Sequence, residues 1–290
     1  MGETQKKIVL SPNAGRDLGF EMTRKVDGML RKLGRRTVVC PMFDDDYFID
    51  IPGDFETAAL EDEISSAEMI ISLGGDGTIL RAARAAAEHG IPVLGVNMGG
   101  KGFMADLEVE DIGLIDKVVS GEYKLGQRMM LDIEVIRGGK IICGDCALND
   151  VIIKGANKVI ELTLHGDGQK IFHFSGDGAV IATPTGSTAY SMSAGGPIVE
   201  PSAHNIIVTP VCAHVLEAKS FVLVDERCVS VEIGHRRHNT AYMSVDGCDY
   251  VPIYVGDTVN VRKSEKYTYF VQLSNRSFYK KVSEKLGEQL

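Results

Sequence analysis

Apolar positions follow two different patterns along the 290 residues of this chain. In the first part, short apolar runs alternate with longer segments in which apolar residues recur every three or four positions, as on one face of a helix. The runs predict strands at 6–10, 37–40, 68–72 and 92–96, and the longer segments predict helices at 17–33, 79–87 and 111–119. Strands that alternate with helices predict a parallel sheet, and hence a Rossmann-like α/β domain.

After Met129 the pattern changes to short strands of alternating apolar and polar residues. The segment 130–136 alternates in this way, and Gly138-Gly139 after it predicts a hairpin turn. Further apolar runs predict strands at 141–142, 151–153, 159–164, 171–174, 178–182, 206–208, 229–233, 241–245, 251–255 and 267–273. This half is therefore expected to be a β-rich, sandwich-like domain.

The two patterns divide the chain into an α/β domain at 1–126 and a β-rich domain at 127–275. Helical spacing at the end of the chain predicts a final helix within 276–290, which is expected to pack back on the first domain. Residues 44–63 are acidic and have few apolar anchors, so a mobile surface connection is expected there.

Composition and charge are those of a soluble globular protein. The chain is 44% apolar and 24% charged, with a formal net charge of −9 and no basic cluster that would favour a nucleic-acid partner. No apolar stretch approaches the roughly 20 residues of a membrane span, and the first residues lack the apolar run of a signal peptide. We therefore expect a cytoplasmic protein with no membrane and no nucleic-acid partner.

The six cysteines do not indicate a disulfide scaffold in a chain of this length. Cys143 and Cys146 form one C-x-x-C without a second pair or a nearby histidine, whereas a structural zinc site needs four ligands. We interpret them as ordinary strand cysteines, with redox activity or adventitious metal binding as the alternative. No protein metal site is predicted.

The clearest candidate for chemistry is Gly74-Gly75-Asp76-Gly77-Thr78, between a predicted strand and a predicted helix. A glycine turn at such a junction lets backbone N–H groups converge on an anion, helped by the helix dipole. A carboxylate at Asp76 would repel a phosphate, so we interpret it as a proton acceptor or a hydroxyl-orienting group. The alternative is a tight turn in which Asp76 caps the helix.

Two better-known nucleotide motifs are not supported. Gly95 through Lys101 matches the pattern of a P-loop, but Gly102 stands where the magnesium-binding Ser or Thr is required. No G-x-G-x-x-G occurs, because Gly75-Asp76-Gly77 continues to Leu80 and Gly176-Asp177-Gly178 continues to Ile181. A dehydrogenase with the usual dinucleotide fingerprint is therefore not predicted.

A second candidate lies in the β-rich half, at 183–197. Its prolines and glycines predict a turn, and Ser187 or Thr188 can cap a short helix after it. Small hydroxyls and free backbone N–H groups around Tyr190 suit a nucleobase and a sugar, with an ordinary capped turn as the alternative. The polar pair Asn149-Asp150 stands in an apolar strand and is a further candidate, with a strand-end turn as the alternative. Asp246-Gly247 predicts only a hairpin turn.

In this order and spacing, the glycine motif, the Asn149-Asp150 pair and the 183–197 segment resemble the NAD kinase family over nearly the whole chain. The glycine motif alone is shared with lipid kinases and, more loosely, with phosphofructokinases, whereas the 183–197 segment is far more specific. The resemblance implies transfer of a phosphoryl group from ATP to the adenosine ribose 2′-hydroxyl of NAD, giving NADP. It also implies a site between the two domains and a homo-oligomer, a tetramer or a dimer.

The resemblance further implies roles for individual residues. Asp76 would orient or deprotonate the accepting hydroxyl, and the glycine motif (Gly74, Gly75, Gly77 and Thr78) would meet the donor's phosphates. Residues implied to contact the dinucleotide are Phe103, Asn149, Asp150, Asp177, Thr188, Ala189, Tyr190 and Ser193. Mg²⁺ or another divalent cation would arrive with ATP, since no carboxylate cluster suggests a dedicated site.

Three positions depart from the family pattern: Asp150 stands where Glu is usual, Lys101 where an apolar residue is usual, and Cys248 where Gln is common.

Two other functions stay open. A lipid kinase would need an acyl-chain cleft and would leave the 183–197 segment without a role. A non-catalytic dinucleotide-binding sensor is the other, and the presence of Asp76 counts against it. The donor, ATP or polyphosphate, also stays open.

Overall fold

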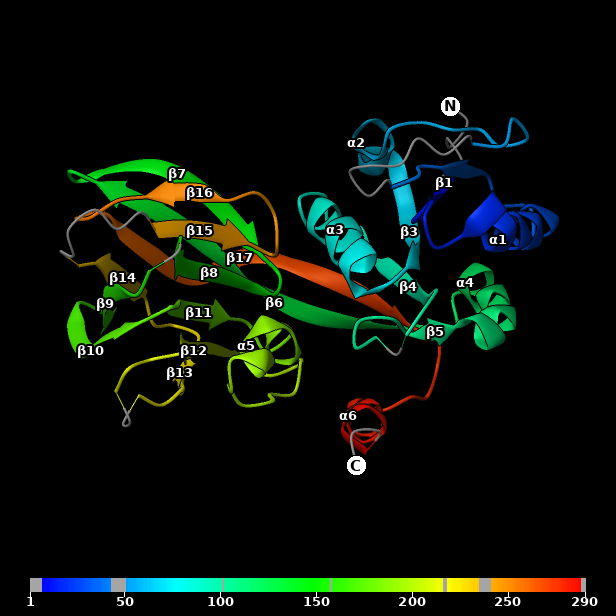
Figure 1. The fold of residues 1–290 in the computed structure, drawn as a ribbon. Coiled ribbons are helices and arrows are strands. Elements are labelled where there is room, and N and C mark those ends of the chain that lie inside the picture. Colours follow the sequence, from blue (N-terminus) through cyan, green and yellow to red (C-terminus); the bar gives the residue numbers. More distant parts are fainter. Residues whose placement is uncertain are drawn as a thin grey trace. The chain divides into compact units, whose positions relative to one another are not determined.

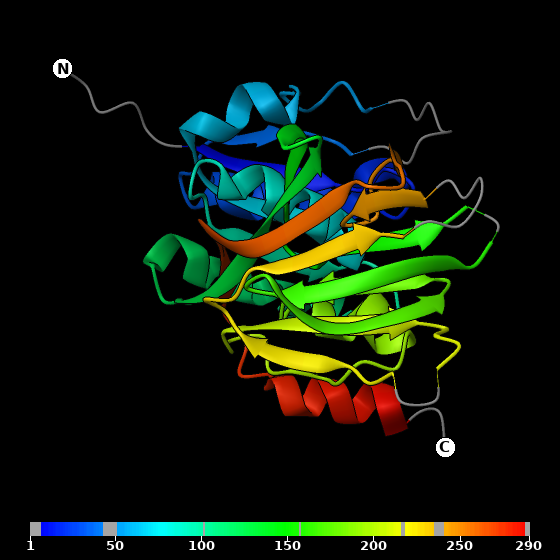
Figure 2. The same cartoon turned by 90° about the vertical axis from the view of Figure 1, so that its left-hand side faces the viewer.

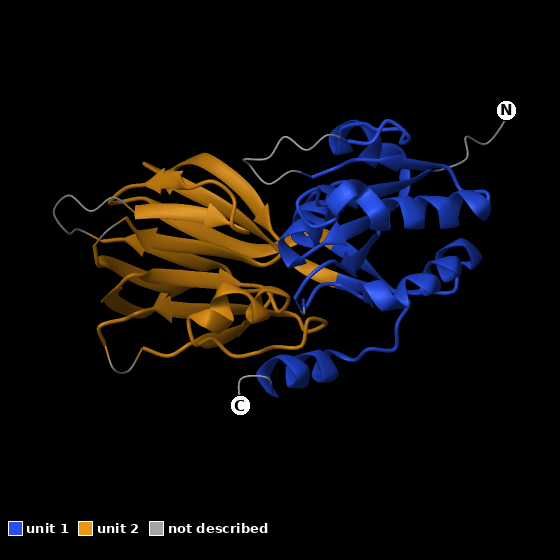
Figure 3. Cartoon of the chain, turned by 45° about the vertical axis from the view of Figure 1, so that its right-hand side comes forward, with its two compact units in different colours: residues 1–127, 268–290 blue, residues 128–267 orange. Residues whose placement is uncertain are grey.

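The computed structural model describes residues 7–42, 51–100, 102–156, 158–215, 218–234 and 241–287. The chain divides into two compact units: unit 1 contains residues 1–127 and 268–290, and unit 2 contains residues 128–267 (Figure 3). Residues 268–275 thus belong to unit 1, although the pattern of the sequence predicted them in the β-rich domain. The physical reason is strand pairing, because Phe270 pairs with Val93 of unit 1.

Unit 1 is built on a parallel sheet, as its alternating pattern predicts. β1 (Lys7–Pro12) lies between β2 (Thr37–Val39) and β3 (Ala67–Gly74). β4 (Val93–Asn97) pairs with β3 and with the short β5 (Leu107–Glu108). All these pairs are parallel, so the carboxyl ends of β1, β3 and β4 lie at one edge of the sheet, where ligands of α/β proteins gather.

Helical segments connect these strands and cover the sheet. One apolar cluster joins Val26 and Leu30 of the first long helix with Ile115, and with Leu10 and Leu73 of the sheet. The helical segments of unit 1 are η1 (Leu18–Phe20), α1 (Glu21–Lys32), α2 (Leu60–Glu63), η2 (Ile64–Ser66), α3 (Asp76–Ala87), η3 (Val109–Ile115), α4 (Asp116–Ser120) and α6 (Phe278–Gly287) (Figure 1).

Two expectations for unit 1 need correction. The helix predicted at 17–33 begins only at Glu21, because Gly19 and Phe20 have positive φ angles of 65° and 57°. The first part of the connection predicted to be mobile, 44–50, lies outside the described residues. Its remainder is anchored rather than free, since Thr57 forms a β-bridge with Val39 and Leu60 is only 8% exposed.

Unit 2 contains two sets of antiparallel strands (Figure 1 and Figure 2). The order in the first set is β13-β12-β11-β8-β15-β16, made of β8 (Asp150–Gly155), β11 (Gly178–Ala182), β12 (Asn205–Val211), β13 (Phe221–Val224), β15 (Ala241–Val245) and β16 (Val251–Ile253). The second set contains β7 (Lys140–Ala147), β9 (Ile160–Gly166), β10 (Gln169–Gly176) and β14 (Val229–Ile233), with the parts of β6 (Lys124–Arg137) and β17 (Thr258–Gln272) that belong to unit 2.

One apolar cluster contains residues from both sets, including Ile153 and Ile181 from the first and Leu131, Leu162 and Val231 from the second. Side chains that alternate along each strand therefore meet in a common core, which is the packing of a sandwich. The predicted combination of an α/β part and a β-rich part is confirmed. None of the helices in the described part of the chain is long and apolar enough to span a membrane.

Candidate functional site

The glycine motif forms the junction of β3 and α3. Gly74 ends the strand, Gly75 is the extended residue before the helix, and α3 begins at Asp76. The Asp76 side chain does not cap its helix, so that alternative is wrong. Its carboxylate instead accepts two hydrogen bonds from the loop between β4 and β5, from the N–H of Phe103 at 2.8 Å and from the N–H of Met104 at 3.1 Å. The structure thus brings Asp76 and Phe103 together.

Glycine is required at two positions around this carboxylate. A Cβ atom at Gly102 would lie 3.1 Å from Asp76 Cγ and still closer to its Oδ1. A Cβ atom at Gly74 would lie 2.6 Å from Thr78 Oγ1. Gly77, by contrast, has nothing within 4 Å of such an atom, so the first turn of α3 is open at this point. Thr78 is 6% exposed and accepts a hydrogen bond from Asn13.

Sequence reasoning missed Arg16, which lies after β1 at the same edge of the sheet. Its guanidinium lies against two glycine turns: a Cβ atom at Gly75 would be 3.0 Å from its Cζ, and one at Gly99 would overlap its Nη1. The available signal was topological, because Arg16 follows the first parallel strand just as Asp76 follows the third.

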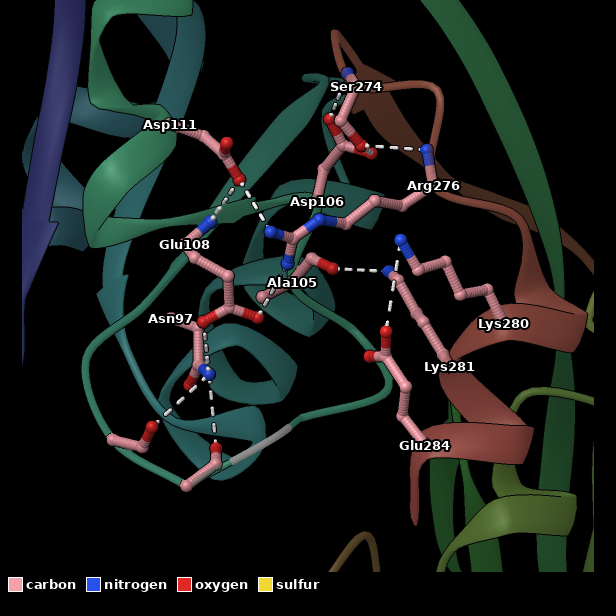
Figure 4. A network of polar contacts seen from close by, with 12 residues as sticks. Asn97, Ala105, Asp106, Glu108, Asp111, Ser274, Arg276, Lys280, Lys281 and Glu284 are labelled. Carbon is pink, nitrogen blue, oxygen red and sulfur yellow. Dashed lines mark hydrogen bonds and ion pairs between the residues drawn. The ribbon is translucent and has the colours of Figure 1, made fainter. Parts of the chain in front are cut away.

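The loop that holds Asp76 is fixed in turn by the end of the chain (Figure 4). Asp106 accepts hydrogen bonds from the N–H groups of Leu273 and Ser274, both at 2.8 Å. Lys281 of α6 donates to the carbonyl of Ala105, and the ammonium of Lys285 lies 4.0 Å from the ring centroid of Phe103. The C-terminal segment therefore restrains the residues that orient Asp76.

A second part of the network in Figure 4 holds the turn after β4. Asn97 donates to the Glu108 carboxylate at 2.8 Å and to the Gly100 carbonyl at 3.1 Å. Arg276 forms ion pairs with Glu108 at 3.2 Å and with Asp111 at 3.0 Å. Lys101, one of the departures from the family pattern, lies outside the described residues.

In unit 2, Asp246 organises the polar pair at the start of β8. Its carboxylate accepts backbone hydrogen bonds from Leu148, Asn149 and Asp150 at 2.8, 2.8 and 2.9 Å. The hairpin turn predicted at Asp246-Gly247 is confirmed between β15 and β16, and the Asp246 carboxylate additionally fixes the start of β8. An Asp-Gly dipeptide at a strand end does not reveal this role, because its partners lie almost a hundred residues earlier.

The 183–197 segment packs directly on this pair. Thr183 donates to the carbonyl of Leu148 at 2.6 Å, and a Cβ atom at Gly186 would lie 2.8 Å from Asn149 Cα. Two buried polar atoms here, Asn149 Oδ1 and Thr185 Oγ1, have no hydrogen-bond partner among the described residues. A buried oxygen without a partner is costly unless a ligand or water fills its hydrogen-bonding capacity.

Asp150 is 4% exposed. Burial, and then the nearby charge of Asp246, raise the pKa of Asp150 to about 7, against a smaller opposing effect of the Tyr190 backbone hydrogen bond. The Asp150 carboxyl is thus poised to carry a proton near neutral pH, and a protonated carboxyl donates a hydrogen bond.

The remaining predicted residues surround Tyr190. The segment contains η4 (Gly186–Thr188) and α5 (Tyr190–Ser193), with Ala189 between them. The predicted caps are wrong, since Thr188 donates to the carbonyl of Thr185 and Ser187 to that of Pro184. Asp177 and Tyr190 line one cavity of about 660 Å³, together with Lys154 and Lys158.

Metal ligation finds little support in the side chains. Among the described residues, no group of three or more His, Cys, Asp or Glu could hold a metal ion. Cys143 and Cys146 both lie on β7, where a separation of three residues directs side chains to opposite faces. Burial raises the pKa of Cys146 to about 11, which disfavours the reactive thiolate.

Comparisons with known proteins agree across both units. The family model for the ATP-NAD kinase N-terminal domain matches residues 7–123, and that for the ATP-NAD kinase C-terminal domain matches residues 148–273. The chain is 37% identical over 287 residues to the NAD kinase of Acetivibrio thermocellus, covering 98% of each chain. It is 39% identical over 232 residues to that of Heliobacterium modesticaldum, covering 79% of this chain and 82% of the relative.

Two solved structures share the fold. Yeast NADH kinase complexed with NADH superimposes with a TM-score of 0.83 at 24% identity, covering 98% of this chain and 89% of the other. An NAD kinase from Archaeoglobus fulgidus in complex with ATP gives a TM-score of 0.73 at 22% identity, covering 97% and 98%. On the family models and the identities over nearly its full length, this chain belongs to the NAD kinase family.

Proposed function

We propose that this protein transfers the terminal phosphoryl group of MgATP to the adenosine ribose 2′-hydroxyl of NAD, giving NADP. The observation that carries the proposal is the Asp76 carboxylate, held at the start of α3 by the N–H groups of Phe103 and Met104. Relatives named NAD kinase at 37% and 39% identity support the reaction.

On the donor side, we assign the phosphates to the junction of β3 and α3. The N-terminus of a helix attracts anions, and the open space beside Gly77 lets a phosphate approach the backbone. Magnesium bridges donor phosphates and neutralises their charge when it arrives with ATP. The described residues offer no carboxylate cluster of their own for it, which supports binding as the MgATP complex.

Asp76 is assigned as the group that orients the 2′-hydroxyl and accepts its proton. In a loose phosphoryl-transfer transition state the alcohol loses its proton late, so correct alignment of the acceptor matters most. The two backbone hydrogen bonds fix both carboxylate oxygens, while each oxygen keeps lone pairs for the substrate hydroxyl.

On the acceptor side, we assign NAD to residues of unit 2. The unpartnered oxygens of Asn149 and Thr185 are hydrogen-bond acceptors suited to ribose hydroxyls or an adenine amino group. Asp150 would hold a ribose hydroxyl, and Tyr190 offers an aromatic face at 43% exposure. Thr188, Ala189, Ser193 and Asp177 are assigned to the same dinucleotide.

The test is NADP formation from NAD, ATP and magnesium by the wild type, Asp76→Asn and Asp116→Asn. Asp116 is an exposed residue of α4 and receives the same change of charge. We expect Asp76→Asn to lose about 10²- to 10⁴-fold in kcat, with Asp116→Asn unchanged. NADP only with polyphosphate would correct the donor. Saturable NAD binding without turnover would favour the sensor, and phosphorylation of a diacylglycerol instead of NAD would favour the lipid kinase.

Three properties stay predictions. They are a cytoplasmic location, a homo-oligomeric state of two or four chains, and the lack of a nucleic-acid partner. Light scattering coupled to size-exclusion chromatography measures the oligomeric state directly.

A further inference from the structure

The loop that carries Arg16 is fixed to the first turn of α3. Asn13 Oδ1 accepts hydrogen bonds from the N–H groups of Gly15 at 3.0 Å and Arg16 at 3.1 Å. The amide nitrogen of the same Asn13 donates to Thr78 Oγ1 at 3.2 Å, and both side chains are buried. One asparagine thus places the backbone of Arg16 relative to the glycine motif.

The guanidinium of Arg16 lies between the turns that follow two neighbouring parallel strands, β3 and β4. A Cβ atom at Gly75 would meet its Cζ at 3.0 Å and its Nη1 at 3.1 Å. A Cβ atom at Gly99 would overlap its Nη1, so a residue other than glycine there would displace the side chain. The guanidinium can occupy this position because Gly75 and Gly99 have no side chains.

Arg16 differs from other arginines of unit 1 in its charge balance. Within the described residues its guanidinium makes no ion pair or hydrogen bond, and the side chain is exposed. Arginines of unit 1 that do pair with a carboxylate include Arg24, Arg31, Arg35, Arg36 and Arg276. A cation without a carboxylate partner, beside the positive end of a 12-residue helix, favours the binding of an anion at this position.

We propose that Arg16 binds the terminal phosphates of the nucleoside triphosphate donor. Guanidinium donors are arranged in a planar fork that matches phosphate oxygens, and their charge stabilises negative charge during phosphoryl transfer. Arg16 therefore contributes to donor affinity and to the rate of transfer, and not to recognition of NAD. This inference rests on the proposed function, since it takes MgATP as the donor.

The test compares Arg16→Gln, Arg16→Lys and Arg36→Gln. Arg36 is an exposed arginine paired with Glu56 and controls for the loss of one positive charge. We expect Arg16→Gln to raise KM for ATP by about 10- to 100-fold, with KM for NAD within about twofold and partial retention of activity in Arg16→Lys. Arg36→Gln should match the wild type.

Gly99→Ala tests the position of the Arg16 guanidinium independently. If the new methyl group acts by displacing Arg16, it should raise KM for ATP in the wild type and add little in the Arg16→Gln background. Additive effects, or an unchanged KM for ATP in Arg16→Gln, would overturn the proposal. Isothermal titration of each protein with MgATP, without NAD, separates this outcome from failure of the proposed function, in which the wild type itself would form no NADP.

Discussion

Replacing Gly102 by alanine tests how the Asp76 carboxylate is held. The added Cβ would lie 3.1 Å from Asp76 Cγ and well under 3.0 Å from its Oδ1, a separation that real Cβ atoms essentially never show. The carboxylate or the loop must therefore shift, and either movement stretches the hydrogen bonds from Phe103 at 2.8 Å and Met104 at 3.1 Å.

The expected magnitude follows from these contacts. A hydrogen bond to a charged group contributes about 1.5–3 kcal/mol to stability. Weakening the two hydrogen bonds from Phe103 and Met104 therefore removes most of the interaction energy that orients the carboxylate. A misplacement of about 1 Å in a reacting group costs about 10²-fold in rate. We therefore expect kcat to fall by about 10²-fold, and the free energy of unfolding to fall by about 1.5–3 kcal/mol as these hydrogen bonds weaken.

Steady-state formation of NADP measures this effect, and Gly100→Ala is the matched control. A Cβ atom at Gly100 meets nothing within 4 Å, so this variant should keep wild-type kcat. Wild-type kcat in Gly102→Ala would refute the account of how Asp76 is oriented. An equal loss in both variants would show that the loop tolerates no added methyl group, and would refute it as well.

Three further predictions concern unit 2. The pKa of Asp150 is raised to about 7, so the unfolded state releases this proton at a lower pH than the folded state. The free energy of unfolding should therefore fall by up to about 1.4 kcal/mol per pH unit between pH 4 and 7. Urea titrations should find this slope absent in Asp150→Asn. Asp246→Asn should lower stability by about 1–3 kcal/mol and raise KM for NAD, because an amide cannot accept all three N–H groups now bound. Arg137→Met should lower the urea midpoint more than Arg262→Met. Arg137 donates two hydrogen bonds, both at 2.8 Å, to Asp257, whose side chain is 1% exposed. Arg262 instead donates to Glu134, whose side chain is 24% exposed.

Local patterns in the sequence were enough for much of the fold. The strands at 178–182, 229–233 and 241–245 have the bounds that their apolar runs predict. The strand at 258–272 was predicted only from 267, because its first part is rich in charged residues. Its polar side chains still alternate with buried ones such as Val259 and Val261, and sheet pairing outweighs the low strand propensity of the charged residues.

The contacts of the site were less predictable. The glycine motif marks Asp76 because the residue types and their spacing are local. Arg16 and Asp246 are single polar residues whose partners lie far along the chain, at Gly99 and at 148–150. Nothing in their immediate neighbours distinguishes them from ordinary turn residues. Their roles become visible only when the fold brings these segments together.

The central claim is that Asp76 promotes phosphoryl transfer to NAD and not substrate binding. Its most direct test is a single-turnover experiment with γ-labelled ATP and NAD, on the wild type and on Asp76→Asn, with MgATP and NAD binding measured on both proteins. We expect label in the 2′-phosphate of NADP with the wild type, and a transfer rate lower by about 10²- to 10⁴-fold in the variant at similar affinities. Equal transfer rates, or label released only as inorganic phosphate by the wild type, would contradict the account.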